Sequence, residues 1–231
     1  MNVSKEKYES YHTANLVPTK WKIDVKQFKK EVNAFPFYQW GDTHTEYPRH
    51  ATPLVNQTGI FESQDKSIGP LDRLNFLEEF PHYKNKKWTD DHIKDWNEWT
   101  GRDHDMSDLI NETHFTRKTL ALSMTCLNVI EELKPHMYRS LILAWNYMGH
   151  FKEHIDTWHP TQWFRLWGTT DPDGMVLRYN GKEQMDVEAG RLYLHDSITK
   201  HEGLAYRDNV YQFFIAFEPN ETLLHSALLK N

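Results

Sequence analysis

The amino-acid sequence predicts a mainly β protein with flanking helices, whose strands form an antiparallel sandwich or barrel. The spacing of apolar residues changes at Pro135 from helical to alternating, and short strand-like segments follow as far as residue 217. Asn180-Gly181, between two of these segments, is typical of a type I′ hairpin turn. With 231 residues, 39% of them apolar, and no shift in composition, residues 1–231 are expected to form one domain.

Residues 1–135 are predicted to form a helical and extended region that covers the strands. Asp24 is a suitable N-cap for a short amphipathic helix, whose apolar row contains Val25, Phe28 and Val32. Residues 35–75 contain four prolines and three glycines. This segment is therefore expected to be extended and rich in turns, with one or two short strands.

Two further helices are predicted in this region. Thr89 is followed by two aspartates and, later, by Gly101, so residues 89–101 carry the signals of a helix start and a helix end. Apolar residues at helical spacing predict a longer helix from Arg117 to Leu133, which Pro135 ends. This second helix is expected to pack against the sheet.

Residues 136–219 are predicted to form the β-barrel core. Apolar and smaller residues alternate from Leu141 to Tyr147, which is the pattern of a strand. Further short strands are predicted at residues 163–168, 175–179, 183–187, 191–195 and 209–217.

Charge and composition exclude several classes of partner. Lys and Arg total 27 while Asp and Glu total 33, so the net charge of −6 argues against nonspecific binding to nucleic acid. No apolar segment has the length of a signal peptide or a membrane span, and the single cysteine, Cys126, cannot form an internal disulfide. The sequence therefore predicts a soluble cytoplasmic protein without a nucleic-acid or membrane partner.

One short motif carries most of the chemical information. His154 and Asp156 are two residues apart, so on a strand their side chains point to the same side. His201 follows 47 residues later, before the last predicted strand. Two imidazoles and one carboxylate can hold Fe(II) on one face and leave three coordination positions open for chemistry. The sequence therefore predicts a metal site at His154, Asp156 and His201.

Overlapping residues allow a different site. His150, Glu153 and His154 match the H-x-x-E-H pattern of inverted zinc peptidases, which requires a helix. The preceding residues are strand-like, and Gly149 and Pro160 leave little room for one. A zinc-dependent hydrolase is nevertheless one alternative. A non-catalytic, cupin-like binding module, in which these histidines hold no metal, is another.

Residues 139–219 resemble the aspartyl/asparaginyl β-hydroxylase family, whose bacterial members include small proline hydroxylases. The resemblance is carried by His154-Ile155-Asp156, by Arg165-Leu166-Trp167-Gly168, by the run from Glu188 to Ser197, and by His201. Members of this family are dioxygenases that use Fe(II), 2-oxoglutarate and O₂. The resemblance implies a double-stranded β-helix core, which is a jelly roll of the cupin type, and a hydroxylase that acts on an amino acid or a protein residue.

The same resemblance implies roles for particular residues. His154, Asp156 and His201 would bind iron, and Arg165 would contact 2-oxoglutarate. The family usually has a second arginine ten residues after the distal histidine, where this chain has Tyr211. A phenol donates one hydrogen bond but cannot neutralise a carboxylate. Arg207, or an N-terminal arginine such as Arg49, is an alternative partner for the far carboxylate of the co-substrate.

Residues beside the predicted ligands are candidates for substrate contact. Trp145, Asn146 and Trp158 flank them and are expected to line the substrate pocket, although aromatic residues beside strands also pack in cores. Asp196 is either a partner that fixes the tautomer of a ligand histidine or a turn residue that ends its strand.

Overall fold

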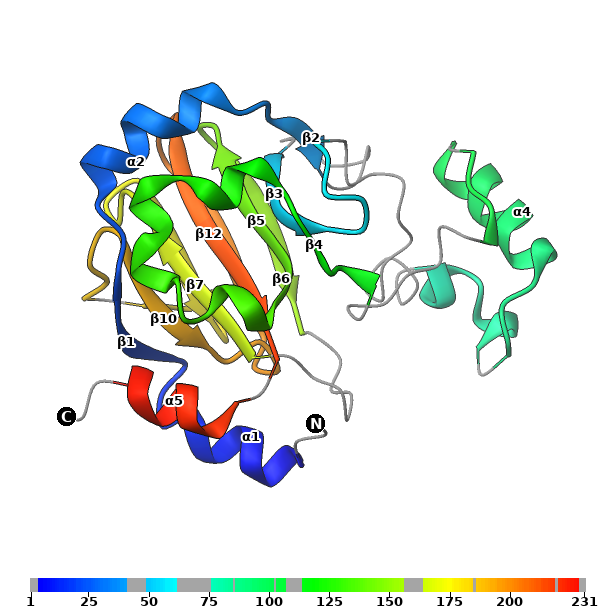
Figure 1. Cartoon of the computed structure of the whole chain (residues 1–231). Coiled ribbons are helices and arrows are strands. Elements are labelled where there is room, and N and C mark those ends of the chain that lie inside the picture. The colour runs from blue at the N-terminus through cyan, green and yellow to red at the C-terminus, as the bar shows by residue number, and fades with distance from the viewer. Residues whose placement is uncertain are drawn as a thin grey trace.

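The computed structural model consists of two antiparallel β-sheets with helices on the outside (Figure 1). It describes residues 4–40, 49–61, 76–84, 86–101, 103–106, 114–155, 164–184, 186–218 and 220–228. Over these residues, every helix is too short or too polar to cross a lipid bilayer.

Eight consecutive strands form the core of the fold. They are β5 (Met137–Trp145), β6 (His150–His154), β7 (Phe164–Thr169), β8 (Met175–Tyr179), β9 (Lys182–Glu183), β10 (Arg191–His195), β11 (His201–Ala205) and β12 (Val210–Phe217). One sheet has the order β10-β7-β12-β5, and the other has the order β6-β11-β8-β9. Because the chain passes repeatedly from one sheet to the other, this order is that of a jelly roll, and the predicted double-stranded β-helix core is confirmed.

Strands from the N-terminal half extend the larger sheet at both edges. β1 (Leu16–Lys22) pairs with β10, whereas β3 (Arg49–Asn56) pairs with β5 and is followed by β2 (Tyr38–Trp40). β4 (Arg117–Lys118) also pairs with β3. β1 contains Pro18, which a strand at the edge of a sheet tolerates because its N–H side need not be paired.

The two faces of the larger sheet contact different cores. We use the name interior cluster for the buried side chains between the two sheets, which include Leu141, Leu143, Trp145, Trp167, Met175, Leu177, Tyr179, Tyr193, Ala205 and Val210. The outer face is covered by a second, larger cluster. Alternation along β12 separates them, because Phe214 packs on the interior cluster and Phe213 on the outer one.

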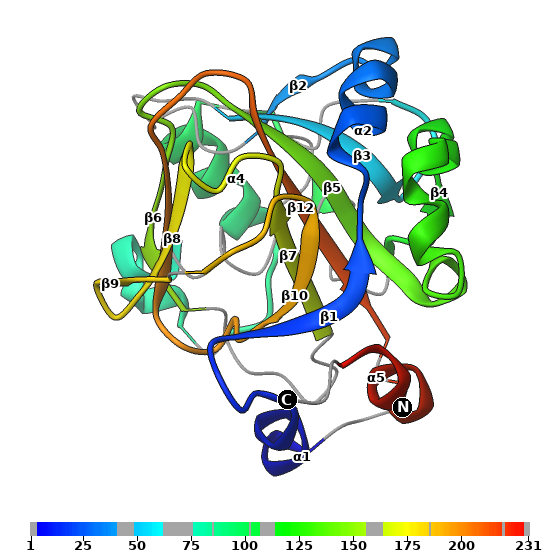
Figure 2. The ribbon, with the colours of Figure 1, turned by 90° about the vertical axis from the view of Figure 1, so that its left-hand side faces the viewer.

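Helices cover the outer face of the larger sheet and one end of the barrel (Figure 2). The α-helices are α1 (Lys5–Tyr11), α2 (Val25–Glu31), α4 (Asp90–Thr100) and α5 (Glu221–Ala227). The 3-10 helices are η1 (Val32–Ala34), η3 (Pro81–Tyr83), η6 (Leu120–Ser123), η7 (Thr125–Ile130) and η8 (Lys134–His136). α4 lies to the side of the sheets and packs in a small aromatic cluster with Phe76 and Trp88.

Two predicted helices are confirmed by their capping contacts. The Asp24 carboxylate accepts hydrogen bonds from the backbone N–H groups of Lys26 and Gln27, at 2.9 and 3.1 Å, so it caps α2. Thr89 is the N-cap of α4, and Gly101 ends that helix in the left-handed conformation with φ of 68°.

The predicted helix from Arg117 to Leu133 is wrong. Residues 117–118 form β4, and η6 and η7 follow, separated at Met124, whose ψ of 134° is extended. Ala121, Met124, Leu127, Ile130 and Leu133 are all buried in the outer cluster. Their spacing is three residues, which places them on one side of a 3-10 helix, whereas an α-helix would rotate them apart.

The strand predictions are confirmed at residues 175–179 and 191–195 and nearly so at 209–217. Asn180 and Gly181 both have positive φ, 49° and 74°, as a type I′ turn requires. The strand predicted at residues 183–187 is wrong, because pairing there ends at Glu183. α1 and β1 were not predicted.

Candidate metal centre

A β-bulge positions His154. On β11, His201 lies opposite His154 and Gly203 lies opposite Phe151, so two steps along β11 match three along β6. The extra residue turns both Phe151 and His154 inward, and their rings are 4.0 Å apart between centroids. His150 points to the outer face, where its Nε2 lies 3.0 Å from a carboxylate oxygen of Glu202.

His154 and His201 face each other across this strand pair, with ring centroids 4.3 Å apart. The Nδ1 of His154 lies 2.7 Å from the carbonyl oxygen of Lys152, and the Nδ1 of His201 lies 2.8 Å from that of Thr199. A carbonyl only accepts hydrogen bonds, so each Nδ1 carries the proton. In the neutral ring the lone pair is then on Nε2, which is the tautomer of a histidine that binds a metal through Nε2.

His201 is held in the form that a metal ligand needs. Its side chain is buried, and this burial, together with the nearby charge of Arg165, lowers the pKa of His201 to about 4 despite the hydrogen bond to Thr199. The ring is therefore neutral near pH 7, and a neutral imidazole does not have to lose a proton before it binds a metal ion.

A third histidine, which the sequence analysis did not select, lies beside this pair. His195 is at the end of β10, and its ring meets that of His201 edge-on at 4.6 Å between centroids. Its Nδ1 is hydrogen bonded to the hydroxyl of Tyr179, which donates to the carbonyl oxygen of Asn15 at 3.0 Å. Burial, followed by the charges of His201 and Arg165, holds the pKa of His195 well below its usual range. His195 is two residues after Tyr193 on β10, so the two side chains point to the same face of the sheet. This spacing is the signal that could have identified His195 as an inward-facing residue.

Arg165 also belongs to the interior face. It is on β7 two residues before Trp167, which is part of the interior cluster, and its guanidinium carbon lies 5.2 Å from the centre of the Phe214 ring. Its charge contributes, after the larger effect of burial, to the lowered pKa of both His195 and His201. A guanidinium in this position is suited to bind a carboxylate.

Tyr211 and Arg207 lie away from this group of residues. Tyr211 points to the outer face of β12, where its ring contacts those of Phe28 and Phe37 at 5.2 and 5.8 Å. Arg207 follows the end of β11 that is farther from His201, and it pairs with Asp171 at 3.3 Å. The expectation that either contacts a co-substrate is therefore not supported. Alternation makes Gln212, not Tyr211, the inward-facing residue of this part of β12.

The predicted substrate residues differ in their surroundings. Trp145 is 1% exposed in the interior cluster, and its Nε1 donates to the side-chain oxygen of Gln212 at 3.1 Å. Asn146 is exposed in the turn that follows, where its carbonyl accepts a hydrogen bond from Gly149. Trp158 and Asp156 lie outside the described residues.

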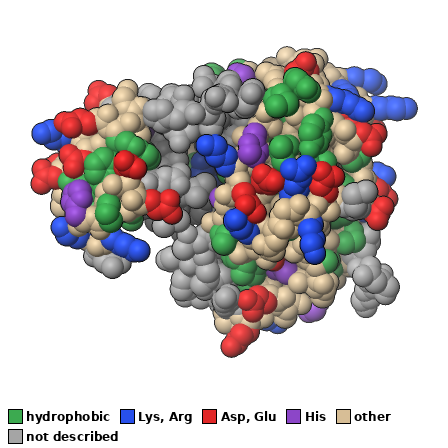
Figure 3. Space-filling model, turned by 180° about the vertical axis from the view of Figure 1, so that it is seen from behind, with side chains coloured by type: hydrophobic (Ala, Val, Ile, Leu, Met, Phe, Trp, Pro, Cys, Tyr) green, Lys and Arg blue, Asp and Glu red, His purple; other side chains and the backbone are tan. Residues whose placement is uncertain are grey.

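The zinc-peptidase alternative requires a helix that the chain does not form. His150, Glu153 and His154 are on strand β6, and only His154 points inward. Glu153 pairs with Lys200 at 2.6 Å, and His150 pairs with Glu202. Figure 3 views the molecule from behind relative to Figure 1, and acidic and basic side chains are interspersed on that face. The alternative of a helical zinc site at His150, Glu153 and His154 is therefore wrong, because these residues lie on a strand.

Asp196 is a turn residue that supports the site indirectly. Its carboxylate accepts hydrogen bonds from the N–H of Ile198 at 3.3 Å and from the hydroxyl of Thr199 at 2.6 Å. The carbonyl of Thr199 is the group that orients His201. The side chain of Asp196 thus fixes the turn that positions His201.

The donors present suit a metal ion bound by two imidazoles and a further ligand. Within the ranges that the structure describes, three or more histidine, cysteine or acidic residues do not gather into a metal-binding group. His154 and His201 supply two nitrogen donors, and Asp156 follows His154 by two residues. This fits the predicted centre, because two imidazoles with Nδ1 already bonded are two of the three protein ligands of a two-histidine, one-carboxylate site.

No protein-family model matches the chain, and no curated protein sequence matches it. Solved structures are weakly similar to it. An oxidoreductase of the 2OG-Fe(II) oxygenase family from Burkholderia pseudomallei is 11% identical with a TM-score of 0.37, over 82% of this chain and 77% of that one. KdgF from Halomonas sp. is 8% identical with a TM-score of 0.29, over 38% and 76%. A predicted oxalate decarboxylase from Thermotoga maritima is 14% identical with a TM-score of 0.29, over 39% and 74%. The fold is therefore assigned from the strand order of this chain.

Proposed function

We propose that this protein is an Fe(II)- and 2-oxoglutarate-dependent oxygenase of the aspartyl/asparaginyl β-hydroxylase type. The observation that carries the proposal is the pair His154 and His201, which face each other across two strands of a jelly roll with both Nδ1 atoms bonded to carbonyls. Asp156 would complete the set of protein ligands. Bound iron, with 2-oxoglutarate and O₂, would supply the oxidation that places a hydroxyl group on a carbon of the substrate.

Arg165 is the residue that we propose to bind the co-substrate. Its guanidinium lies over the ring of Phe214 in a largely apolar interior, where a charge-assisted hydrogen bond to a carboxylate is strong. Because Tyr211 packs on the outer face, the far carboxylate would depend on Arg165 without help from Tyr211.

The remaining residues orient these groups and exclude water. Thr199 and Lys152 hold the ligand rings through their carbonyls, and Asp196 holds Thr199. The aromatic side chains of the interior cluster make the surroundings apolar. A dry and rigid site is what a protein contributes to chemistry that a cofactor performs.

The proposed substrate is a free amino acid or an amino-acid residue of a protein. A screen for succinate released from 2-oxoglutarate under air, with proline, lysine, asparagine and arginine among the additions, tests this directly. An oxygenase releases more succinate with one of them, whereas a non-catalytic cupin-like binding module releases none.

A second experiment tests the co-substrate site without turnover. Anaerobic addition of Fe(II) and 2-oxoglutarate should give a weak visible charge-transfer band. Arg165→Gln should weaken 2-oxoglutarate binding at least about tenfold, since a charge-assisted hydrogen bond is lost, whereas Arg207→Gln should leave it unchanged. Equal loss in both variants would contradict the role of Arg165.

A further inference from the structure

Gln212 is a polar side chain that β12 directs between the two sheets. Val210 belongs to the interior cluster and Phe214 packs on it, and side chains on a strand alternate between its two faces. Gln212 therefore faces inward, whereas Tyr211 packs against Phe28 on the outer face. The Gln212 side chain is 8% exposed. β12 thus places an amide among apolar side chains of the interior.

The orientation of this amide is fixed by Trp145. The indole Nε1 of Trp145 donates to the side-chain oxygen of Gln212 at 3.1 Å, and an indole N–H can only donate. The amide oxygen therefore faces Trp145, and the NH₂ group is left to donate elsewhere. Among the described residues the amide nitrogen has no hydrogen-bond partner, and it is not one of the polar atoms that are sealed from solvent. An acceptor that enters the interior can therefore reach it.

Trp145 also locates the amide relative to the histidines. Gly203 is two residues after His201 on β11, and a Cβ atom there would lie 3.8 Å from the ring of Trp145. The indole that holds Gln212 thus crosses from the larger sheet to the smaller one, a short distance along β11 from His201.

Arg165 reaches the same part of the interior from β7. Its guanidinium carbon lies 5.2 Å from the centre of the Phe214 ring, and Phe214 is the next inward-facing residue of β12 after Gln212. Same-face neighbours on a strand are about 7 Å apart. One carboxylate can bridge such a separation through its two oxygens, because each hydrogen bond adds about 2.9 Å.

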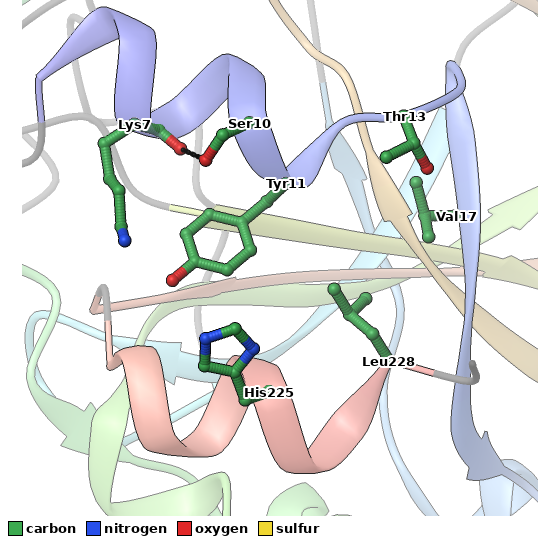
Figure 4. A pocket seen from close by; sticks show the side chains of 7 residues that line it. All are labelled: Lys7, Ser10, Tyr11, Thr13, Val17, His225 and Leu228. Carbon is green, nitrogen blue, oxygen red and sulfur yellow. Dashed lines mark hydrogen bonds between the residues drawn. The ribbon is translucent and has the colours of Figure 1, made fainter.

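The pocket between α1 and α5 is a different place (Figure 4). Tyr11 extends toward it from α1, and His225 lies on α5. Of the described residues that line it, none belongs to the interior cluster, and Lys7 already pairs with Glu221 at 3.4 Å. This pocket therefore does not contribute to a site beside the histidines.

We propose that Gln212 determines the specificity for the co-substrate, because its NH₂ group donates a hydrogen bond to the far carboxylate of 2-oxoglutarate. Arg165 neutralises the charge of that carboxylate, and the amide fixes its orientation without adding a second charge. This inference rests on the proposed function of the site.

Two 2-oxo acids of equal length isolate this hydrogen bond. 2-Oxopentanoate has a methyl group where 2-oxoglutarate has its far carboxylate, so the two acids differ only at the end that Gln212 contacts. Each is titrated anaerobically into the Fe(II)-loaded full chain by isothermal titration calorimetry. Gln212→Met should weaken 2-oxoglutarate binding at least about tenfold, since a hydrogen bond to a charged acceptor is lost, and should leave 2-oxopentanoate binding unchanged.

The outcomes separate this inference from the proposed function. Equal weakening of both acids in Gln212→Met, or unchanged binding of both, would overturn the role of Gln212 and leave the proposed function standing. Wild type that binds neither acid would contradict the proposed function, and this inference with it. Tyr211→Phe, on the outer face of the same strand, is the matched control and should change neither affinity.

Wild-type protein provides a second readout, which does not depend on the folding of Gln212→Met. In ¹⁵N-labelled protein loaded with Zn(II), which is not paramagnetic, the side-chain amide protons of Gln212 are identified by their nuclear Overhauser effect to the indole proton of Trp145. 2-Oxoglutarate should shift these amide signals more than 2-oxopentanoate does. Equal shifts from the two acids would overturn the role of Gln212.

Discussion

His154 and His201 are direct cross-strand neighbours, and each imidazole is fixed by the main-chain carbonyl two residues before it. This relationship depends on the bulge in β6, because regular alternation from Phe151 would point His154 outward. The backbone therefore holds the two rings in the tautomer that leaves the lone pair on Nε2.

The first prediction concerns these tautomers. In protein prepared without metal, near pH 7, His154 and His201 should both carry the proton on Nδ1, which is the less common tautomer of a neutral histidine side chain in water. Long-range ¹H–¹⁵N correlation spectra of the histidine rings distinguish the two forms. A proton on Nε2 of either ring would contradict the hydrogen bonds to Lys152 and Thr199.

A second prediction concerns the tyrosine that connects α1 to the segment before His201. The hydroxyl of Tyr8 accepts a hydrogen bond from the N–H of Ser197 at 3.3 Å, and both residues are buried. Tyr8→Phe removes this acceptor and should lower the free energy of unfolding by about 1–3 kcal/mol. Denaturant unfolding measures the loss. Tyr11→Phe on the same helix is the control, and equal losses in the two variants would contradict the prediction.

A third prediction concerns stability in acid. Burial raises the pKa of Glu31, but hydrogen bonds from Gln27, Cys126 and Thr125 outweigh it and lower the pKa to about 2. A carboxyl whose pKa is lower in the folded state stabilises that state above its unfolded pKa of 4.5, and this stabilisation is lost as the pH falls toward 2.

The difference in unfolding free energy between wild type and Glu31→Gln should therefore shrink between pH 5 and pH 2. Denaturant unfolding at several pH values measures it, and Glu98→Gln, at an exposed glutamate on α4, corrects for the loss of one charge. A difference that stays constant over this range would exclude Glu31 as a source of acid sensitivity.

A fourth prediction concerns the start of β10, the strand that carries His195. Gly190 has φ of 78°, and a Cβ atom there would lie 2.2 Å from the carbonyl oxygen of Ile23. Gly190→Ala should cost about 3–5 kcal/mol, from the left-handed backbone and the overlap together. Gly101→Ala has a similar φ of 68° in open space and should cost about 1–2 kcal/mol. Denaturant unfolding measures both losses of stability. Similar losses in Gly190→Ala and Gly101→Ala would contradict the prediction, because the overlap with Ile23 would then cost nothing.

The sequence predicted the strands and turns whose signals are local. The caps at Asp24 and Thr89, the turn at Asn180 and the alternation of β8 and β10 all act within a few residues, and each is found in the structure. The helix predicted from Arg117 was wrong because a three-residue spacing of apolar side chains resembles an α-helical stripe over a short window.

The site was harder to predict because its geometry depends on pairing between distant segments. The bulge that turns His154 inward exists only in the register of β6 against β11. His195 is on β10 in one sheet and His201 is on β11 in the other. Their contact therefore depends on how the two sheets pack, which no local sequence pattern encodes. Tyr211 was selected because it lies ten residues after His201. The face of the sheet on which it lies depends instead on the alternation of side chains along β12, which places Tyr211 on the outer face.

Fe(II) binding to the full chain without co-substrate tests the central claim most directly. Isothermal titration under anaerobic conditions should give one ion per chain for wild type and for His150→Ala, whose imidazole points outward on the same strand. His154→Ala and His201→Ala should each lose this binding. Tight binding that survives His201→Ala, or that is lost equally in His150→Ala, would contradict a metal centre built on His154 and His201.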